Sequence, residues 1–359
     1  MNKVLMIASE SSHFRNFHIA YIERLIQHGA LVYTAANGVF QYDGVIHKTL
    51  KFRKKITSPA NIGVIFALIS LIRRERFDAV YTNSTLAGIA GRMAVKLSGV
   101  KSVKCRHICH GYLFNDDGSM KSRVYLMFEK LVRKRTELLA VMNRADFEIA
   151  KKYSLGREIV FINGMGLDAE KFAPVPDAEI VREREKLGAK DGDVLFLCVG
   201  EFSARKNQAA IIEACAKLRR TDYRMIFAGD GEFFEECQKK ARDRGLDGHS
   251  VFLGHFTNMN LLYRACDCLI SASSFEGLPF NVMEALYCGA DIIVSDVKGN
   301  SDLAERTDVY PYGNTDRLAE LMESARPADR KRTLSKKYLL ENAFNENFNL
   351  LKYDRISNK

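Results

Sequence analysis

Short apolar runs alternate with longer stretches of helical periodicity through the first third of the chain. Strands are predicted at Lys3–Ala8, Leu31–Ala35, Ala79–Thr82 and Lys101–Ile108, and helices at Phe17–His28, Ile62–Glu75 and Leu86–Leu97. Continuous apolar runs of this length are typical of strands that are buried on both faces. Strands that alternate with helices favour a parallel sheet covered by helices on both sides.

A second alternating series begins at Asp193. Its predicted strands are Val194–Val199, Tyr223–Ala228, Val251–Leu253 and Cys268–Ser271, and its predicted helices are Gln208–Leu218, Glu232–Arg244 and Asn258–Ala265. The stretch Asn163–Asp177 between the two series contains prolines and glycines and breaks the periodicity, which marks a linker. We therefore predict two doubly wound Rossmann-like α/β domains, residues 1–170 and 171–335.

Composition limits the class of protein. The chain has 359 residues, of which 47% are hydrophobic and 27% charged, as in soluble globular proteins of two ordinary domains. The net charge of +10 indicates an anionic partner, which is a nucleic acid, a phosphorylated substrate or an anionic membrane. The first residues form a strand without a cleavage pattern, and eight cysteines fit a reducing compartment, so we expect a cytoplasmic protein.

Four metal-ligating side chains crowd one predicted strand: Cys105, His107, Cys109 and His110. Zinc pairs normally have two to four intervening residues and a second pair elsewhere. Here the four residues alternate along the strand and no second cluster follows, so we expect no metal.

The segment Phe275–Leu286, FEGLPFNVMEAL, places two glutamates around a Gly-Leu-Pro turn and an apolar helix. Carboxylates are seldom buried without partners, so Glu276 and Glu284 suggest a site that binds hydroxyls. Pro279 in the first helical turn would leave N–H donors at the positive end of the helix dipole. Such a site suits a nucleotide-sugar. The alternative is that Glu276 caps the helix and Glu284 lies on its solvated face.

A basic loop, GEFSARKNQ, follows the strand Val194–Val199. Gly200 permits a close turn, and Arg205 and Lys206 project where the carboxyl ends of parallel strands bind ligands. Arginine offers a planar fork to phosphate oxygens and lysine a point charge. The loop therefore predicts a phosphate contact, the alternative being a solvated basic turn.

These two segments resemble the donor site of retaining glycosyltransferases of family four, which have the GT-B fold. The paired glutamates, the Gly-Leu-Pro turn and the basic loop all match that family, and FAGDGE (Phe227–Glu232) matches its nucleotide-binding loop. The resemblance implies two domains facing a cleft, with a terminal helix, residues 336–359, that crosses back to the first domain. It is weak around Glu305–Gly313, where the family's usual strand is missing.

The first domain carries two further matches, both after predicted strands. Ile7–His18 contains Ser-His-x-Arg-x-Phe-His, and His110–Phe114 reads HGYLF. Together they resemble a bacterial subgroup that builds capsular and exopolysaccharide repeat units on polyprenyl-diphosphate carriers. The resemblance implies that His110 lies beside the transferred sugar and that His13, Arg15 and His18 face the acceptor. For a lone histidine at a strand end, an ordinary polar loop residue is the alternative.

The resemblance implies a retaining, metal-independent transfer from a UDP-sugar, without a cofactor. Arg205 and Lys206 would neutralise the leaving diphosphate, Glu284 would accept hydrogen bonds from the ribose, and Glu276 would hold the sugar. The donor-binding residues implied are Gly200, Arg205, Lys206, Gly229, Gly231, Glu276, Gly277, Leu278, Pro279 and Glu284, and those implied in catalysis are His110, Glu276, Arg205 and Lys206. The acceptor would be a lipid-linked or oligosaccharide glycan. A GT-B sugar-nucleotide epimerase and a non-catalytic module that binds anions are the alternatives.

A membrane partner is suggested by Ile62–Ile72, which is apolar on nearly every face and is too short to span a bilayer. Lys51, Arg53, Lys54 and Lys55 precede it, and Arg73, Arg74 and Arg76 follow it. Cations around an apolar helix favour docking on anionic lipid, at the inner face of the cell membrane. The alternative is a helix buried within the first domain. We expect no nucleic-acid partner.

Overall fold

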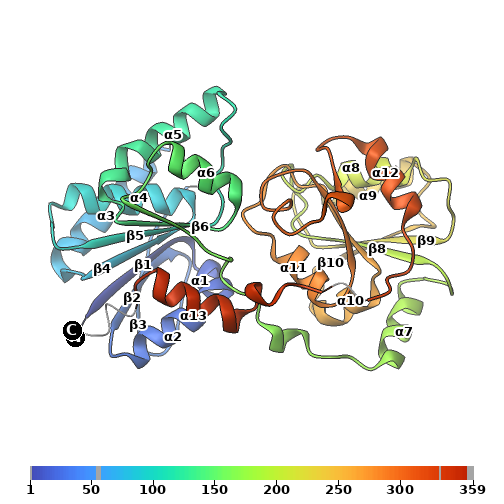
Figure 1. The fold of residues 1–359 in the computed structure, drawn as a ribbon, viewed down its shortest axis with the longest axis horizontal. Coiled ribbons are helices and arrows are strands. Elements are labelled where there is room, and N and C mark those ends of the chain that lie inside the picture. Colours follow the sequence, from blue (N-terminus) through green and yellow to red (C-terminus); the bar gives the residue numbers. More distant parts are fainter. Residues whose placement is uncertain (1, 54–57, 331–332, 354–359) are drawn as a thin grey trace. The chain divides into compact units, whose positions relative to one another are not determined.

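The chain forms two compact units in a computed structural model that describes residues 2–53, 58–330 and 333–353 (Figure 1). Unit 1 consists of Met1–Gly166 together with Leu340–Lys359, and unit 2 consists of Leu167–Leu339. The predicted second domain, residues 171–335, lies within unit 2, and its ends differ from those of the unit by a few residues. Lys54 and Lys55 of the predicted basic segment lie outside the described residues.

In the described part of unit 1, seven strands form one parallel sheet in the order β3-β2-β1-β4-β5-β6-β7. They are β1 (Lys3–Glu10), β2 (Leu31–Asn37), β3 (Val45–Thr49), β4 (Ala79–Asn83), β5 (Lys104–Cys109), β6 (Leu138–Val141) and β7 (Glu158–Phe161). The strands predicted at β1, β2, β4 and β5 are confirmed, since these are the buried apolar runs. No strand was predicted at β3, whose residues VIHKT are mostly half-buried or exposed at the edge of the sheet.

Helices cover both faces of this sheet. They are α1 (Ser12–Phe17), α2 (Ile19–Gln27), α3 (Ala60–Glu75), α4 (Thr85–Ser98), α5 (Met120–Val132), α6 (Arg144–Lys152) and α13 (Leu340–Leu350). Figure 1 shows α3 and α4 on one side of the sheet, with α2 and α13 on the other. The single helix predicted over Phe17–His28 is wrong at its start, because the backbone of His18 (φ −126°, ψ 0°) interrupts it between α1 and α2.

Helix α13 packs on α2 and on the segment around Gly164 in unit 1. The side-chain amide of Asn347 donates to the Tyr21 hydroxyl at 2.9 Å and to the Gly164 carbonyl at 2.7 Å. The ring of Phe344 lies 4.9 Å from that of Tyr21. A little further on, the buried ring of Tyr353 stacks at 4.3 Å on Tyr81 of β4. The last described residues therefore complete the core of unit 1.

In the described part of unit 2, six parallel strands form a sheet in the order β10-β9-β8-β11-β12-β13. They are β8 (Val194–Val199), β9 (Tyr223–Ala228), β10 (Ser250–Gly254), β11 (Cys268–Ser271), β12 (Asp291–Ser295) and β13 (Val309–Tyr310). Three of the predicted strands, β8, β9 and β11, agree with the structure to the residue. The family strand expected to be missing near Glu305–Gly313 is present as the short β13, which pairs with β12.

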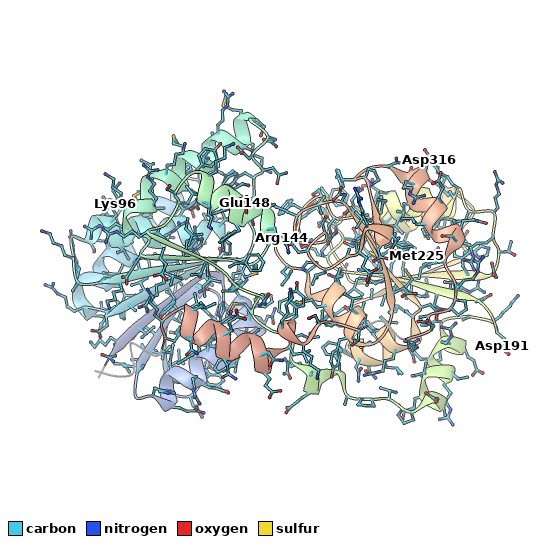
Figure 2. The ribbon with its side chains drawn as sticks, in the orientation of Figure 1. Lys96, Arg144, Glu148, Asp191, Met225 and Asp316 are labelled. Carbon is cyan, nitrogen blue, oxygen red and sulfur yellow. The ribbon has the colours of Figure 1, made fainter. Side chains whose placement is uncertain are left out.

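The helices of unit 2 are α7 (Asp177–Lys186), α8 (Gln208–Cys215), α9 (Phe234–Asp243), α10 (Met259–Ala265), α11 (Phe280–Tyr287) and α12 (Thr315–Ser324). Met225 of β9 is 1% exposed and lies inside this unit, whereas Asp191 and Asp316 lie at its periphery (Figure 2). The cysteines of the chain are free and buried, which agrees with their expected role as small apolar residues.

Helix α3 has one face that is buried in the core and one face that is exposed. It packs Val64, Leu68 and Ile72 into the core, while the side chains of Ile62 and Phe66 are 55% and 66% exposed. Other helices of unit 1 also expose large apolar side chains. These are Leu97 of α4 and Met120, Met127 and Leu131 of α5. Within the described residues, no helix combines the length and the apolar character needed to cross a bilayer.

Candidate functional site

Two glycine-containing loops meet at the carboxyl end of the sheet in unit 2. The amide of Gly200, after β8, donates to the Ala228 carbonyl at 3.0 Å, and the amide of Phe202 donates to the Asp230 carbonyl at 2.9 Å. Gly229 has φ of +136°, and a Cβ there would lie 2.1 Å from the Gly200 carbonyl oxygen. Only glycine allows this approach. The loops predicted to contact the nucleotide, which contain Gly200, Gly229 and Gly231, therefore lie side by side.

Glu276 joins the basic loop to the glutamate segment. Its Oε1 accepts from a guanidinium nitrogen of Arg205 at 2.7 Å and from the Lys206 ammonium at 2.8 Å. The Glu276 side chain is 10% exposed, Lys206 is 12% exposed and Arg205 is 33% exposed. Residues predicted from two separate motifs thus form one ion-paired cluster, in which the Glu276 carboxylate is paired with two cations.

The charge state of this cluster follows from its burial and its partners. Burial alone would raise the pKa of Glu276, but the positive charges of Lys206 and Arg205 outweigh it and leave that pKa below its ordinary value. Glu276 is therefore ionised at neutral pH. The cluster carries one negative and two positive charges, so it retains a net positive charge that can attract a diphosphate.

A second loop, Asp296–Leu303, supports Glu276 from the other side. The amide of Glu276 donates to the Lys298 carbonyl at 3.2 Å. Gly299 has φ of +83°, and a Cβ at this position would lie 2.7 Å from the Gly277 carbonyl oxygen. This contact fixes the backbone of the turn that contains Glu276 and Gly277.

Helix α11 begins directly after this turn, at Phe280. Pro279 is the residue before the helix and not part of its first turn, which corrects the sequence-based placement. Leu278 is buried, and the side-chain amide of Asn281 donates to the carbonyl of Val199 at 3.0 Å. This bond attaches the start of α11 to the end of β8, where the basic loop starts.

Glu284 lies one turn further along α11. Its carboxylate accepts a hydrogen bond of 2.6 Å from the hydroxyl of Tyr263, a fully buried residue of α10. Burial raises the pKa of Glu284, and the Tyr263 hydroxyl and the charge of Lys171 oppose this rise without cancelling it. Glu284 is thus a half-buried acceptor with a fixed donor partner and not a residue on the fully solvated face of the helix.

Unit 1 gathers three histidines at the carboxyl edge of its own sheet. His13 belongs to α1, His18 lies between α1 and α2, and His110 follows β5. The Nε2 atoms of His13 and His110 are 3.2 Å apart. The ring centroid of His18 lies 5.2 Å from that of His13 and 5.6 Å from that of His110.

The loop after His110 is anchored by helix α6. The amide of Tyr112 donates to the Asp146 carboxylate at 2.8 Å, and the Thr85 hydroxyl donates to the Gly111 carbonyl at 3.3 Å. Tyr112 and Phe114 of the HGYLF segment are both buried. The segment therefore forms part of the framework of unit 1, and this framework positions His110.

Two neighbouring polar residues do not join the histidines. The Arg15 guanidinium donates to the Val39 carbonyl at 2.7 Å and lies 5.8 Å from the ring centroid of Phe40. Nδ1 of His107 lies 2.9 Å from the Thr82 carbonyl oxygen, so this buried side chain is bonded to the neighbouring strand β4. The structure thus separates Arg15 from His13 and His18, with which the sequence had grouped it.

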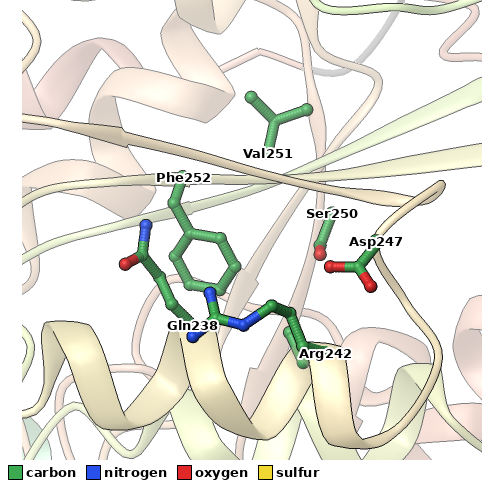
Figure 3. Close-up of a pocket in the computed structure, with 7 residues that line it drawn as sticks. Gln238, Arg242, Asp247, Ser250, Val251 and Phe252 are labelled. Atoms are coloured by element: carbon green, nitrogen blue, oxygen red, sulfur yellow. The ribbon is translucent and has the colours of Figure 1, made fainter.

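A surface pocket of about 330 Å³ is present elsewhere in unit 2 (Figure 3). Gln238 and Arg242 of α9 line it, together with Asp247 and with Ser250 and Phe252 of β10. It lies at the start of β10, whereas the residues discussed above follow the ends of strands. In open α/β sheets ligands bind at the carboxyl ends of the strands, so this pocket is not the candidate site.

Several residues of the site were missed by the sequence patterns. Tyr263, Asn281 and Gly299 each contact a predicted residue or its backbone, and each comes from a different segment. The loop DVKGNSDL around Gly299 follows the glutamate motif in the sequence, so its position could have indicated that it contributes to the site. Nothing in the local sequence marks Tyr263, because its partner Glu284 lies 21 residues away.

Comparisons with known proteins agree with this architecture. Residues 179–337 match the family model described as "Glycosyl transferases group 1". The chain is 29% identical over 306 residues to "Putative glycosyltransferase EpsD" of Bacillus subtilis, covering 84% of this chain and 80% of that protein. It is also 29% identical over 248 residues to an Escherichia coli protein named UDP-Gal:alpha-D-GlcNAc-diphosphoundecaprenol alpha-1,3-galactosyltransferase, covering 67% of this chain and 63% of that protein.

Solved structures with low sequence identity share the fold over nearly the whole chain. Anabaena HepE, in complex with UDP and glucose, superposes with a TM-score of 0.72 at 17% identity, over 99% of this chain and 97% of that one. Sucrose-phosphate synthase from Thermosynechococcus elongatus gives 0.73 at 17% identity, over 99% and 96%. The fold is GT-B, with two Rossmann-like domains, as predicted. The family match and the relatives support a glycosyltransferase of group 1.

Proposed function

We propose that this protein is a retaining glycosyltransferase that moves a sugar from a UDP-sugar to a polyprenyl-diphosphate-linked glycan during the synthesis of a cell-surface polysaccharide. The observation that carries this proposal is the cluster of Arg205, Lys206 and Glu276 at the carboxyl end of β8. It combines two cations for phosphate oxygens with a carboxylate acceptor for hydroxyls. Both groups are needed to bind a nucleotide-sugar.

The donor chemistry follows from the charges. Transfer leaves a negative charge on the departing UDP, and positively charged groups at that position stabilise the transition state. Arg205 and Lys206 supply this charge, so the reaction needs neither a metal ion at the diphosphate nor a cofactor. Glu276 accepts hydrogen bonds from hydroxyls of the sugar, and the half-buried Glu284 accepts them from the ribose. We assign no protein base, since the leaving phosphate can take the acceptor proton.

The acceptor side is proposed to be in unit 1. The galactosyltransferase of Escherichia coli, by its name, acts on a sugar carried by diphosphoundecaprenol, and a lipid-linked acceptor of this kind is proposed here too. His110 would lie beside the transferred sugar and His13 would contact the acceptor, whereas His18 is fully buried and would lie behind them. The guanidinium of Arg15 already donates to the Val39 carbonyl, so we propose no acceptor contact for this residue.

A membrane surface is the second proposed partner. Ile62 and Phe66 of α3 and Met127 of α5 are apolar and at least half exposed, and basic residues accompany them on both helices. An apolar surface bordered by cations suits docking on anionic lipid, where each basic residue contributes on the order of 1 kcal/mol. We propose peripheral binding at the inner face of the cell membrane. The anionic partners that match the net charge of +10 are then the membrane lipid and the donor diphosphate, and not a nucleic acid.

The test is a product analysis with a panel of UDP-sugars, with and without a synthetic polyprenyl-diphosphate-linked sugar. We expect UDP release and an extended lipid-linked glycan only when both substrates are present. The anomeric configuration of the new bond, read by NMR, should match that of the donor. An altered sugar nucleotide formed from the donor alone would favour the epimerase alternative. No product from any donor would reject the proposal.

A further inference from the structure

Three histidine side chains lie close together in unit 1, although His110 is far from His13 and His18 in the sequence. One ligand nitrogen from each of them lies within 4.8 Å of the other two. In a tetrahedral zinc site with Zn–N bonds of about 2.0–2.1 Å, neighbouring ligand nitrogens are about 3.3 Å apart. The 3.2 Å between the Nε2 atoms of His13 and His110 already has this value. The nitrogen separations to His18, which are at most 4.8 Å, would have to shorten toward this value when an ion binds.

His18 provides an independent observation. Its side chain is fully buried, and neither ring nitrogen has a hydrogen-bond partner among the described residues. A buried polar atom without a partner costs about 1–3 kcal/mol, so such atoms normally find one. The ring lies among Phe14, Tyr21 and the other two histidines. A ligand held between the three imidazoles would give His18 the partner that these residues do not.

We infer that His13, His18 and His110 form a three-histidine site for a divalent transition-metal ion, with Zn²⁺ as the best match. Neutral imidazole nitrogen is the commonest protein ligand for such ions and suits Zn²⁺, Cu²⁺ and Ni²⁺ more than Mg²⁺ or Ca²⁺. Three protein ligands leave a fourth position for an oxygen atom of water or of a bound molecule.

The chemistry of imidazole allows two kinds of ligand at this cluster. A neutral ring offers a lone pair to a cation, whereas a phosphate group would need protonated rings in the same place. Phosphate is therefore the competing ligand in the test.

This site is separate from the neutralisation of the donor diphosphate. The cations proposed for that step, Arg205 and Lys206, belong to unit 2, whereas the histidines belong to unit 1. The inference also revises the expectation, drawn from the spacing around Cys105, that the chain has no metal site. His110 does take part, but with histidines close to 100 residues earlier and not with its neighbours in the strand.

The experiment is calorimetric titration of the full-length protein, first stripped with EDTA and desalted, with ZnCl₂ in phosphate-free buffer. Co²⁺ in a parallel titration reports four-coordinate geometry through intense visible absorption. We expect one ion per chain and these absorption bands. His13→Gln and His110→Gln, at half-buried positions, should each weaken binding at least tenfold. His255→Gln, an exposed histidine of unit 2, is the matched control and should bind like the wild type.

His18→Gln should also lose binding, and its melting temperature is measured because this position is fully buried. Wild-type protein without saturable binding would overturn the inference, and so would unchanged affinity in His13→Gln and His110→Gln. A rise in melting temperature with inorganic phosphate but not with Zn²⁺ would assign the cluster to an anion instead. These assays contain no donor or acceptor, so a failure of the proposed transfer reaction would leave their outcome unaffected.

Discussion

The ion pair between Lys206 and Glu276 provides the sharpest test of the donor site. Lys206→Met removes the ammonium group but keeps an unbranched side chain, which matters because the lysine methylenes pack beside Gly200. Glu276→Gln removes the negative charge with little change of shape. Together with the double variant they form a thermodynamic cycle that isolates the pairwise term.

The expected magnitude follows from the geometry. The Nζ–Oε1 distance is 2.8 Å between side chains that are 12% and 10% exposed, and a charge-assisted hydrogen bond contributes about 1.5–3 kcal/mol. The bond from Arg205, which is 33% exposed, contributes less, about 0.5–1 kcal/mol. Lys206→Met should therefore cost about 2 kcal/mol of unfolding free energy. The coupling energy between the two positions should be about 1–2 kcal/mol.

The chain contains no tryptophan, so Phe233→Trp gives a fluorescence signal confined to unit 2. Urea unfolding followed through this residue measures the four free energies of the cycle. UDP binding by calorimetry completes the test: Lys206→Met should weaken it, whereas Glu276→Gln should spare it. Lys206→Ala should also lower the transfer rate by roughly 10²–10³-fold. Unfolding energies that add within about 0.5 kcal/mol would refute the ion pair, and unchanged UDP affinity would refute the diphosphate role.

Other consequences can be tested in the same preparations. Glu284→Gln should weaken UDP binding by about tenfold, and Tyr263→Phe, which removes the fixed donor, should change it by less; equal losses would reject the assignment of the carboxylate. UDP binding should persist in EDTA, and a loss that only added metal reverses would contradict a metal-independent donor site. The pKa of His13 is about 4 in the folded protein and 6.5 in the unfolded one, so the unfolded state takes up the proton first. His13 should contribute up to about 3 kcal/mol to the fall in unfolding free energy between pH 6.5 and 4, and His13→Gln should remove this share in EDTA-containing buffer. Phe66→Glu should reduce salt-sensitive binding to anionic vesicles without lowering the melting temperature, whereas Val181→Glu, an exposed apolar position of unit 2, should not.

Local patterns in the sequence were enough to predict most of the fold. Strands β8, β9 and β11 are mostly buried on both faces, so each is a largely apolar run, with Arg224 as the exception within β9. The edge strand β3 is half solvated and has no such run, and β13 has only two residues. The break at His18 was also missed, because the apolar periodicity of α2 continues through it.

The same local patterns could not predict which residues from different motifs contact each other. Arg205 and Glu276 were each predicted from their own motif, but 71 positions separate them, and their ion pair depends on how β8 and α11 meet. His13 and His110 are 97 positions apart and come together because β1 and β5 end at the same edge of one sheet. Motifs indicated which residues matter, whereas the contacts between them depend on tertiary packing.

The return of α13 to unit 1 has a consequence for how the protein is made. Unit 1 is interrupted by the whole of unit 2, so a ribosome must synthesise Leu167–Leu339 before α13 exists. At about 5–20 residues per second, this takes roughly 9–35 s. During that time Tyr21 lacks Asn347, and Tyr81 lacks the ring of Tyr353. Unit 2 is contiguous and can fold first, so the half that begins the chain is the last to be finished.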